Sequence, residues 1–130
     1  MMAAEKLRLA LCDDDRIFRT LVRAVIDTQD DMQVVSESCD GSDCVREVAQ
    51  VRPDVVLLDL DMPAMTGFEA LDRLGAVCPA TKVIVLSGET REEVEHVVLE
   101  RGAIAFIDKG AAHLVGSLAG AIRSAVRTAA

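Results

Sequence analysis

The chain has 130 residues, a length typical of one domain with its own hydrophobic core. Its formal net charge of −8 argues against nucleic acid as a direct partner, and no apolar run approaches the length of a membrane span. Residues 1–5 lack the basic flank and apolar core of a signal peptide, so we expect a cytoplasmic protein with no membrane association. We expect one domain over residues 1–130, with an ordered core from about residue 6 to residue 128.

The four cysteines, Cys12, Cys39, Cys44 and Cys78, show neither Cys-x-x-Cys spacing nor a companion histidine pattern. A zinc site or a disulfide framework is therefore not expected. Cys12 lies in a strand pattern and is interpreted as a small core residue.

Residues 7–12 form the first predicted strand, which runs into Asp13, Asp14 and Asp15. A helix is predicted from Asp15, whose side chain can cap it. Apolar residues recur on that helix at helical spacing: Ile17, Leu21, Ala24 and Val25.

A short second strand is predicted over residues 32–36 after a turn at Asp30 and Asp31. Another turn over residues 40–42 leads to the second helix, with Ser42 as its expected cap. That helix is closed by Arg52-Pro53, because proline restricts the residue before it.

Residues 55–58 form an unbroken apolar run that ends at Asp59. Such a run is typical of a strand buried on both faces of a parallel sheet. Open sheets of this kind bind ligands just past the carboxyl ends of their strands, where Asp59 would lie. Met62-Pro63 and Gly67 then impose a loop.

The next predicted helix carries Phe68, Leu71 and Leu74 and ends near Gly75 and Pro79. A buried strand follows over residues 82–86 and stops at Ser87-Gly88.

A helix is predicted over residues 92–101, with Gly102 as its stop and with Val94, Val97 and Val98 facing inward. A last strand over residues 103–107 leads to Asp108, Lys109 and Gly110. The final helix is indicated by apolar residues at helical spacing: Leu114, Leu118, Ile122 and Ala125.

Five predicted strands alternate with five helices, which indicates an α/β fold with a flavodoxin-like, doubly wound parallel sheet of strand order 2-1-3-4-5. Because parallel crossovers place all carboxyl ends on one edge, side chains distant in sequence should converge there. They are Asp13, Asp14, Asp59, Ser87 and Lys109.

Carboxylates, a lysine and a hydroxyl form an oxygen-rich site that suits Mg²⁺. A metal ion and a lysine can neutralise phosphoryl oxygens, and a carboxylate can act as the nucleophile that becomes an aspartyl phosphate. Each residue alone also has a simpler interpretation: Asp15 or Ser87 as a helix cap, Lys109 as a surface lysine, and Phe106 as core. The joint pattern is far more specific than any of its members.

The sequence resembles the receiver domain of bacterial two-component response regulators over nearly its whole length. Four motifs carry the resemblance: the acidic cluster 12–15, the segment from Asp59 through Met62-Pro63 to Gly67, the segment 86–88, and the segment 106–109.

The resemblance implies that Asp59 accepts a phosphoryl group from the phosphohistidine of a histidine kinase. It also implies that Mg²⁺ is held by Asp13, Asp14 and Asp59 together with the backbone carbonyl of Asp61. Such a protein is no enzyme beyond its own phosphorylation and dephosphorylation.

The resemblance further implies that Ser87 and Lys109 bind phosphoryl oxygens and that Phe106 is an aromatic switch. The output would pass through the face of the fourth helix, last strand and last helix to an output domain, a downstream partner or a phosphorylation-dependent homodimer.

The chain departs from the family pattern at three positions. Gly110 follows the lysine where proline is usual, and Phe106 lacks the hydroxyl of the commoner tyrosine. Asp61 adds a negative charge beside the site, and with Glu89 it is expected to flank the path to the phosphoryl group and to tune phosphorylation and dephosphorylation.

Three alternatives remain open. A haloacid-dehalogenase-type phosphatase would also use an Asp-x-Asp nucleophile motif, as at Asp59 and Asp61, but that family has this motif on its first strand. A flavodoxin would place a hydroxyl-rich phosphate loop where Asp13 to Asp15 stand. A pseudo-receiver would act as a binding module without phosphorylation.

Overall fold

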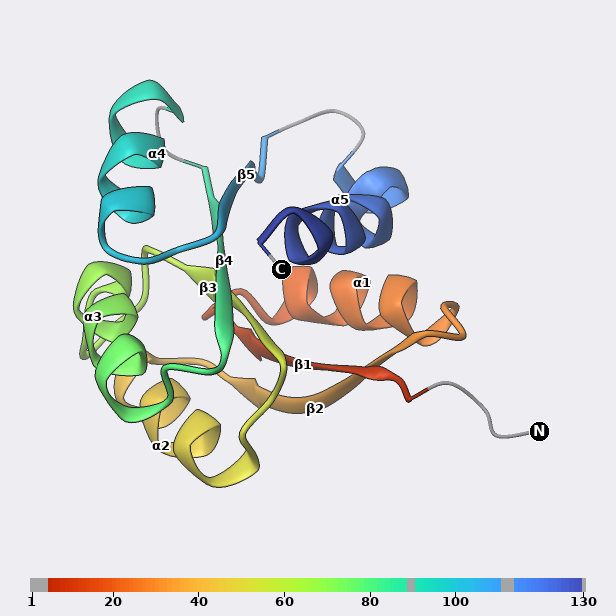
Figure 1. The fold of residues 1–130 in the computed structure, drawn as a ribbon, viewed down its shortest axis with the longest axis horizontal. Helices are drawn as coiled ribbons and strands as arrows, with labels where there is room; N and C mark the ends of the chain where they lie inside the picture. The colour runs from red at the N-terminus through yellow and green to blue at the C-terminus, as the bar shows by residue number, and fades with distance from the viewer. Residues whose placement is uncertain (1–4, 89–90, 111–113, 130) are drawn as a thin grey trace.

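The computed structural model describes residues 5–88, 91–110 and 114–129, and only the backbone of residues 91, 114 and 115. Its centre is a parallel sheet of five strands in the order β2-β1-β3-β4-β5 (Figure 1). This confirms the predicted flavodoxin-like topology. The strands are β1 (Leu7–Cys12), β2 (Met32–Ser38), β3 (Val55–Asp59), β4 (Lys82–Ser87) and β5 (Ala105–Asp108).

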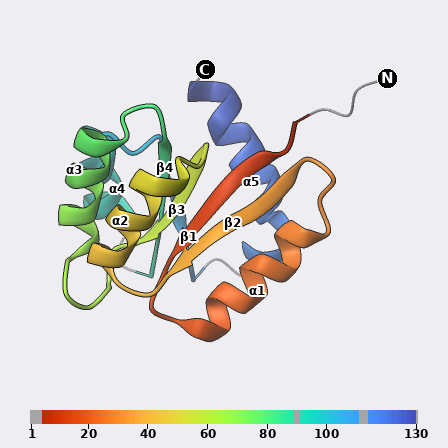
Figure 2. The ribbon, with the colours of Figure 1, turned by 90° about the horizontal axis from the view of Figure 1, so that it is seen from below.

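The helices form a layer on each side of the sheet, with α1 and α5 on one face and α2, α3 and α4 on the other (Figures 1 and 2). Within the described part of the chain, no helix combines the length and apolar character that crossing a bilayer requires. The helices are α1 (Arg16–Asp27), α2 (Gly41–Val51), α3 (Gly67–Val77), α4 (Arg91–Glu100) and α5 (Leu114–Ala129).

All five residues of β3 are buried, as its continuous apolar run predicted. Alternate residues of each central strand point to opposite faces, so the sheet divides the core in two. Leu58 and Val85 pack on the side of α2, α3 and α4, whereas Leu57 and Ile84 pack on the side of α1 and α5. Asp59 therefore emerges from the most deeply buried strand of the sheet.

The buried face of α1 differs from the apolar series picked out in the sequence. Ile17 and Leu21 are 74% and 46% exposed, whereas Val22 and Ile26 are buried and Phe18 packs beside them. The helix carries two overlapping apolar stripes, and its packing on the sheet decides which one turns inward. Prediction of the wrong stripe follows from that ambiguity.

The three inward assignments on α4 are only partly confirmed. Val98 is fully buried and Val94 packs against the core, but Val97 is 36% exposed. Adjacent residues on a helix point about 100° apart, so Val97 and Val98 cannot both face the sheet.

Two helix boundaries also differ from the prediction. Asp40, not Ser42, caps α2, because its Oδ1 accepts a hydrogen bond of 2.7 Å from the Asp43 N–H. Gly75 lies inside α3, which continues to its cap at Cys78.

A disulfide joins Cys12 to Cys44, with 5.8 Å between their Cα atoms. Cys12 is a buried core residue as predicted, but the expectation of no disulfide was wrong. Cys39 and Cys78 remain free thiols, exposed and buried respectively. Sequence spacing does not reveal this pair, because Cys12 and Cys44 meet only when α2 packs against β1.

Candidate functional site

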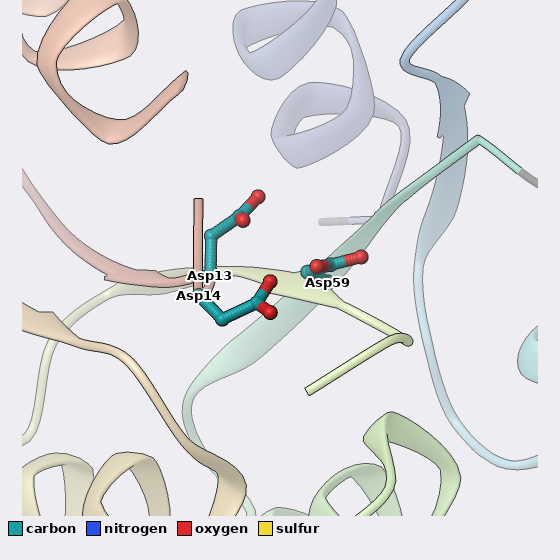
Figure 3. Close-up of side chains that lie close together, drawn as sticks. All are labelled: Asp13, Asp14 and Asp59. Carbon is teal, nitrogen blue, oxygen red and sulfur yellow. The ribbon is translucent and has the colours of Figure 1, made fainter. Parts of the chain in front are cut away.

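Three carboxylates meet where β1 and β3 end (Figure 3). One oxygen from each of Asp13, Asp14 and Asp59 lies within 4.8 Å of the other two. Asp13 and Asp59 are each only 4% exposed, whereas Asp14 faces solvent. The predicted convergence of these three residues is confirmed.

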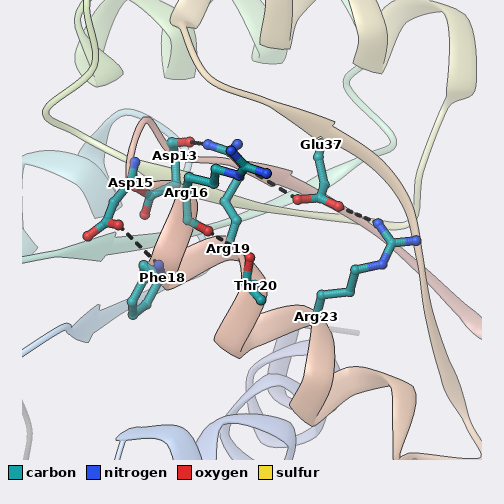
Figure 4. A network of polar contacts seen from close by, with 8 residues as sticks. All are labelled: Asp13, Asp15, Arg16, Phe18, Arg19, Thr20, Arg23 and Glu37. Carbon is teal, nitrogen blue, oxygen red and sulfur yellow. Dashed lines mark hydrogen bonds and ion pairs between the residues drawn. The ribbon is translucent and has the colours of Figure 1, made fainter.

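Asp13 is held by contacts from two neighbouring elements. Its N–H donates to the Ser38 carbonyl at 3.0 Å, and its carbonyl accepts a hydrogen bond of 2.6 Å from Arg19 on α1. Arg19 and Arg23 both pair with Glu37 on β2, which ties α1 to the edge strand (Figure 4). The carboxylate is therefore placed by backbone anchors and not by a flexible loop.

Lys109 follows β5 and supplies the positive charge of the site. Its Nζ lies 2.6 Å from Asp13 Oδ2 and 3.5 Å from Asp59 Oδ2. Burial alone would lower the pKa of Lys109, but its interactions with the two carboxylates outweigh that effect and raise the pKa. The same ammonium lies 4.4 Å from the centre of the Phe18 ring, within the range of a cation–π contact.

The carboxylate of Asp59 carries an unfavourable charge in the absence of metal. Burial, followed by the adjacent charge of Asp13, raises its pKa to about 6, although Lys109 and the Asp61 N–H act in the opposite direction. That N–H donates to Asp59 Oδ1 at 3.2 Å. Two of the three carboxylate charges are thus not balanced by a lysine, and a cation would relieve this excess.

The arrangement fits Mg²⁺ in size and in chemistry. Ligands on opposite sides of this ion lie about 4.2 Å apart, since each bond is about 2.1 Å long. The triad oxygens lie within 4.8 Å of one another, so small side-chain adjustments would bring them within reach of one ion. Exposure of Asp14 leaves room for the waters that Mg²⁺ keeps.

The other predicted residues lie around this triad to differing degrees. Ser87 ends β4 and is fully buried, and the Lys109 N–H donates to its carbonyl at 2.9 Å. Phe106 is buried in β5 at 4% exposure, on the side of α2, α3 and α4. The side chain of Asp61 is exposed, and Glu89 lies outside the described residues.

Sequence reasoning missed Phe18 and Arg19. Both lie on α1 directly after the acidic cluster, at positions one helical turn in from its cap. The available signal for Arg19 was a basic residue in the first turn of the helix, spaced to reach back to the end of β1. No sequence signal pairs Phe18 with Lys109, which is 91 positions away.

Comparison with known proteins places this geometry in a family. The family model described as response regulator receiver domain matches residues 9–116. The chain is 36% identical over 126 residues to the transcriptional regulatory protein YxjL of Bacillus subtilis, and 35% identical over 103 residues to the chemotaxis protein CheY of Listeria monocytogenes. These matches cover 97% and 79% of the chain, and 57% and 86% of the two relatives.

A solved structure supports the same family. The response regulator domain of Thermotoga maritima CheB has a TM-score of 0.87 at 30% identity, covering 95% of this chain and 98% of that one. Several curated relatives are longer: the chain spans 57% of YxjL and 35% of a protein-glutamate methylesterase of Caldanaerobacter subterraneus, to which it is 34% identical. From its matched residues and its fold, this chain belongs to the response regulator receiver domain family of two-component signalling.

Proposed function

We propose that Asp59 accepts a phosphoryl group from the phosphohistidine of a histidine kinase. The supporting observation is a buried carboxylate at the tip of β3, facing Asp13 and Asp14 within 4.8 Å and Lys109 at 3.5 Å. An oxygen of Asp59 attacks phosphorus, the phosphorus–nitrogen bond breaks, and its electron pair remains on the imidazole, which takes up a proton.

The residues that would hold Mg²⁺ are the triad and the backbone carbonyl of Asp61. When bound, the ion would neutralise charge on the phosphoryl oxygens and on the ionised Asp59. Lys109 remains beside Asp59 and pairs with a further phosphoryl oxygen. Ser87, at the end of β4, donates its hydroxyl to another.

A test uses acetyl phosphate as the donor and intact mass as the readout. We expect the mass to increase by one phosphate only when Mg²⁺ is present, and Asp59→Asn to abolish that increase. Uptake at the wild-type rate by the variant would show that the acceptor is misplaced. Sustained release of phosphate from a phosphomonoester would favour the phosphatase alternative, and no uptake at all would favour a pseudo-receiver.

The proposed output is a change on the face formed by α4, β5 and α5. Ser87 is the last residue of β4, and Phe106 lies in the neighbouring strand β5 and packs in the core. A movement of one can therefore be passed to the other through the core. This face would contact an output domain, a partner protein or a second copy of the chain.

Ser87→Ala separates phosphorylation from this output. We expect the variant to take up phosphate, but to lose the change in hydrogen exchange over residues 92–101 and any dimerisation seen by size-exclusion chromatography. An equal exchange response in wild type and variant would contradict the switch.

A further inference from the structure

One cysteine of the Cys12–Cys44 disulfide is adjacent in sequence to the acidic triad. Cys12 is the last residue of β1 and immediately precedes Asp13, while Cys44 lies in the first turns of α2. Both cysteines are buried, at 1% and 0% exposure. No step of the proposed phosphoryl transfer uses this bond.

The amino end of α2 also presses on the loop that follows Asp59. A Cβ atom at Gly41 would lie 2.6 Å from the Met65 carbonyl oxygen and 2.8 Å from the Met65 Cβ, so no space separates helix and loop. The same loop contains Asp61, whose carbonyl is the proposed fourth protein ligand. A short helix segment therefore connects both halves of the metal site.

The disulfide is the covalent part of that connection. On the opposite side, Asp13 is anchored by hydrogen bonds from its N–H to Ser38 and to its carbonyl from Arg19. Toward α2, its neighbour Cys12 is bonded directly to the helix. The disulfide is thus one of the links that fix the position of Asp13 relative to the Asp61 loop, beside the pairing of β1 with β3.

We propose that Cys12 and Cys44 form a redox-responsive modification site that sets the metal affinity of the phosphoacceptor triad. The proposal rests on the proposed Mg²⁺-dependent function. A dithiol reductant would supply two electrons and two protons: its thiolate attacks one sulfur, the sulfur–sulfur bond breaks, and its second thiol resolves the mixed disulfide. The products are two cysteine thiols and the oxidised reductant.

Reduction must move the elements that carry the site. Bonded sulfurs lie about 2.05 Å apart, whereas non-bonded heavy atoms require about 3.5–4.0 Å. Protein cores have little free space, so we expect the cysteine side chains to separate with a shift of α2 against β1, which the close contact of Gly41 with Met65 passes to the loop. We expect reduction to weaken Mg²⁺ binding by about five- to tenfold, at the lower end of the typical coupling between two sites.

Thermodynamic linkage predicts that Mg²⁺ affects the thiol–disulfide equilibrium by the same factor as reduction affects Mg²⁺ binding. If reduction weakens Mg²⁺ binding, Mg²⁺ must shift the thiol–disulfide equilibrium toward the disulfide by an equal factor. This reciprocal shift does not depend on phosphorylation, so it is independent of activity.

The test uses the whole chain with Cys39→Ser, which removes the exposed free thiol. Alkylation of the denatured protein should then label Cys78 alone in the oxidised form, and also Cys12 and Cys44 after reduction. Calorimetric titration gives Mg²⁺ affinity in both forms, and equilibration in a dithiol redox buffer with and without Mg²⁺ gives the reciprocal shift. The double variant Cys12→Ala/Cys44→Ala should bind Mg²⁺ with the affinity of the reduced form, and dithiols should not change that affinity.

Each outcome decides between the two proposals. Labelling of all three cysteines in the oxidised sample, or equal Mg²⁺ affinity in the two forms, overturns the redox site and leaves phosphoryl transfer intact. Absence of both Mg²⁺ binding and phosphorylation in either form overturns the proposed function and the redox site with it. If the double alanine variant does not fold, the comparison of oxidised and reduced protein still decides.

Discussion

The two ends of the sheet treat aspartate in opposite ways. At the amino end, Arg123 on α5 holds Asp31 with two contacts of 2.7 Å, and this pairing keeps the pKa of Asp31 below its usual value. At the carboxyl end, burial and Asp13 raise the pKa of Asp59 to about 6. An aspartate thus forms a structural ion pair at one end of the sheet, whereas at the other end an aspartate carries a charge that its neighbours only partly neutralise.

The comparison shows where stability has been given up for function. At the amino end, charged and polar groups have partners. Arg8 also donates hydrogen bonds to the Arg52 and Val51 carbonyls and so caps the end of α2. At the carboxyl end, Lys109 pairs with two of the three carboxylates, Asp13 and Asp59. The excess of negative charge at this triad, which could bind a metal ion, destabilises the metal-free fold.

The largest expected effect comes from backbone packing at the carboxyl end. In Gly67→Ala, the new Cβ would lie 2.3 Å from Leu60 Cα and 2.7 Å from the Asp59 carbonyl oxygen. Since both atoms belong to the backbone, we expect a loss of about 3 kcal/mol in unfolding free energy, measured by urea denaturation.

The matched control for this substitution lies in the same helix. Gly75 has nothing within 4 Å of its Cβ position, so Gly75→Ala should stabilise the protein by about 0.5–1 kcal/mol. Equal stability of the two variants would contradict the close approach at Gly67.

A second, smaller effect tests the charge at Asp59 directly. Below about pH 3 the carboxyl is protonated in both the folded and the unfolded state, so its ionisation has no effect on stability. As pH rises from about 4 to 6, the unfolded chain loses this proton first, and the folded state loses stability relative to it. In metal-free buffer at pH 7.5, Asp59→Asn should therefore be more stable than wild type by about 1–3 kcal/mol.

Urea denaturation at about pH 3, below both pKa values, should show no difference and so checks the sign, and saturating Mg²⁺ should reduce the difference at pH 7.5. Asp31→Asn is the matched control at the other end of the sheet and should destabilise the protein slightly, because it removes a partner of Arg123. A destabilising Asp59→Asn at pH 7.5 without metal would break the contrast between the two ends.

A third effect concerns Phe18, which covers the lysine of the site. Loss of a cation–π contact is worth about 0.5–1 kcal/mol at a half-exposed position, so Phe18→Leu should slow phosphorylation by acetyl phosphate about two- to fivefold. Phe18→Tyr keeps the aromatic face and should react at nearly the wild-type rate.

A double-mutant cycle separates this role from packing. In a Lys109→Met background, Phe18→Leu should no longer change the rate of phosphorylation by acetyl phosphate, because there is no ammonium to position. The same fold-change with and without the lysine would assign Phe18 to the core alone.

The smallest expected effect is at Asp61. Its charge should repel an anionic donor, so Asp61→Asn should speed uptake from acetyl phosphate by about threefold, toward the lower end of a three- to tenfold range, since the side chain is exposed and screened. Intact mass or radiolabel at saturating Mg²⁺ gives the rate. Unchanged or slower uptake would leave only the backbone carbonyl of Asp61 with a role.

Local patterns were sufficient for the topology and for most of the site. Unbroken apolar runs such as residues 55–58 identify buried parallel strands, and parallel strands share one carboxyl edge. That rule alone brings Asp13, Asp59 and Lys109 together before any coordinates are known. The proximity of the three carboxylates and the lysine was accordingly predicted correctly.

Only the tertiary structure decided how the helices sit on that sheet. A period of 3.6 residues shows which side chains share a face, but it cannot choose between the Ile17 and the Val22 stripe of α1 when both are apolar. The rotation of α1 brings Phe18 to Lys109, and the docking of α2 brings Cys44 to Cys12. These pairs depend on packing between elements distant in sequence, which local periodicity does not encode.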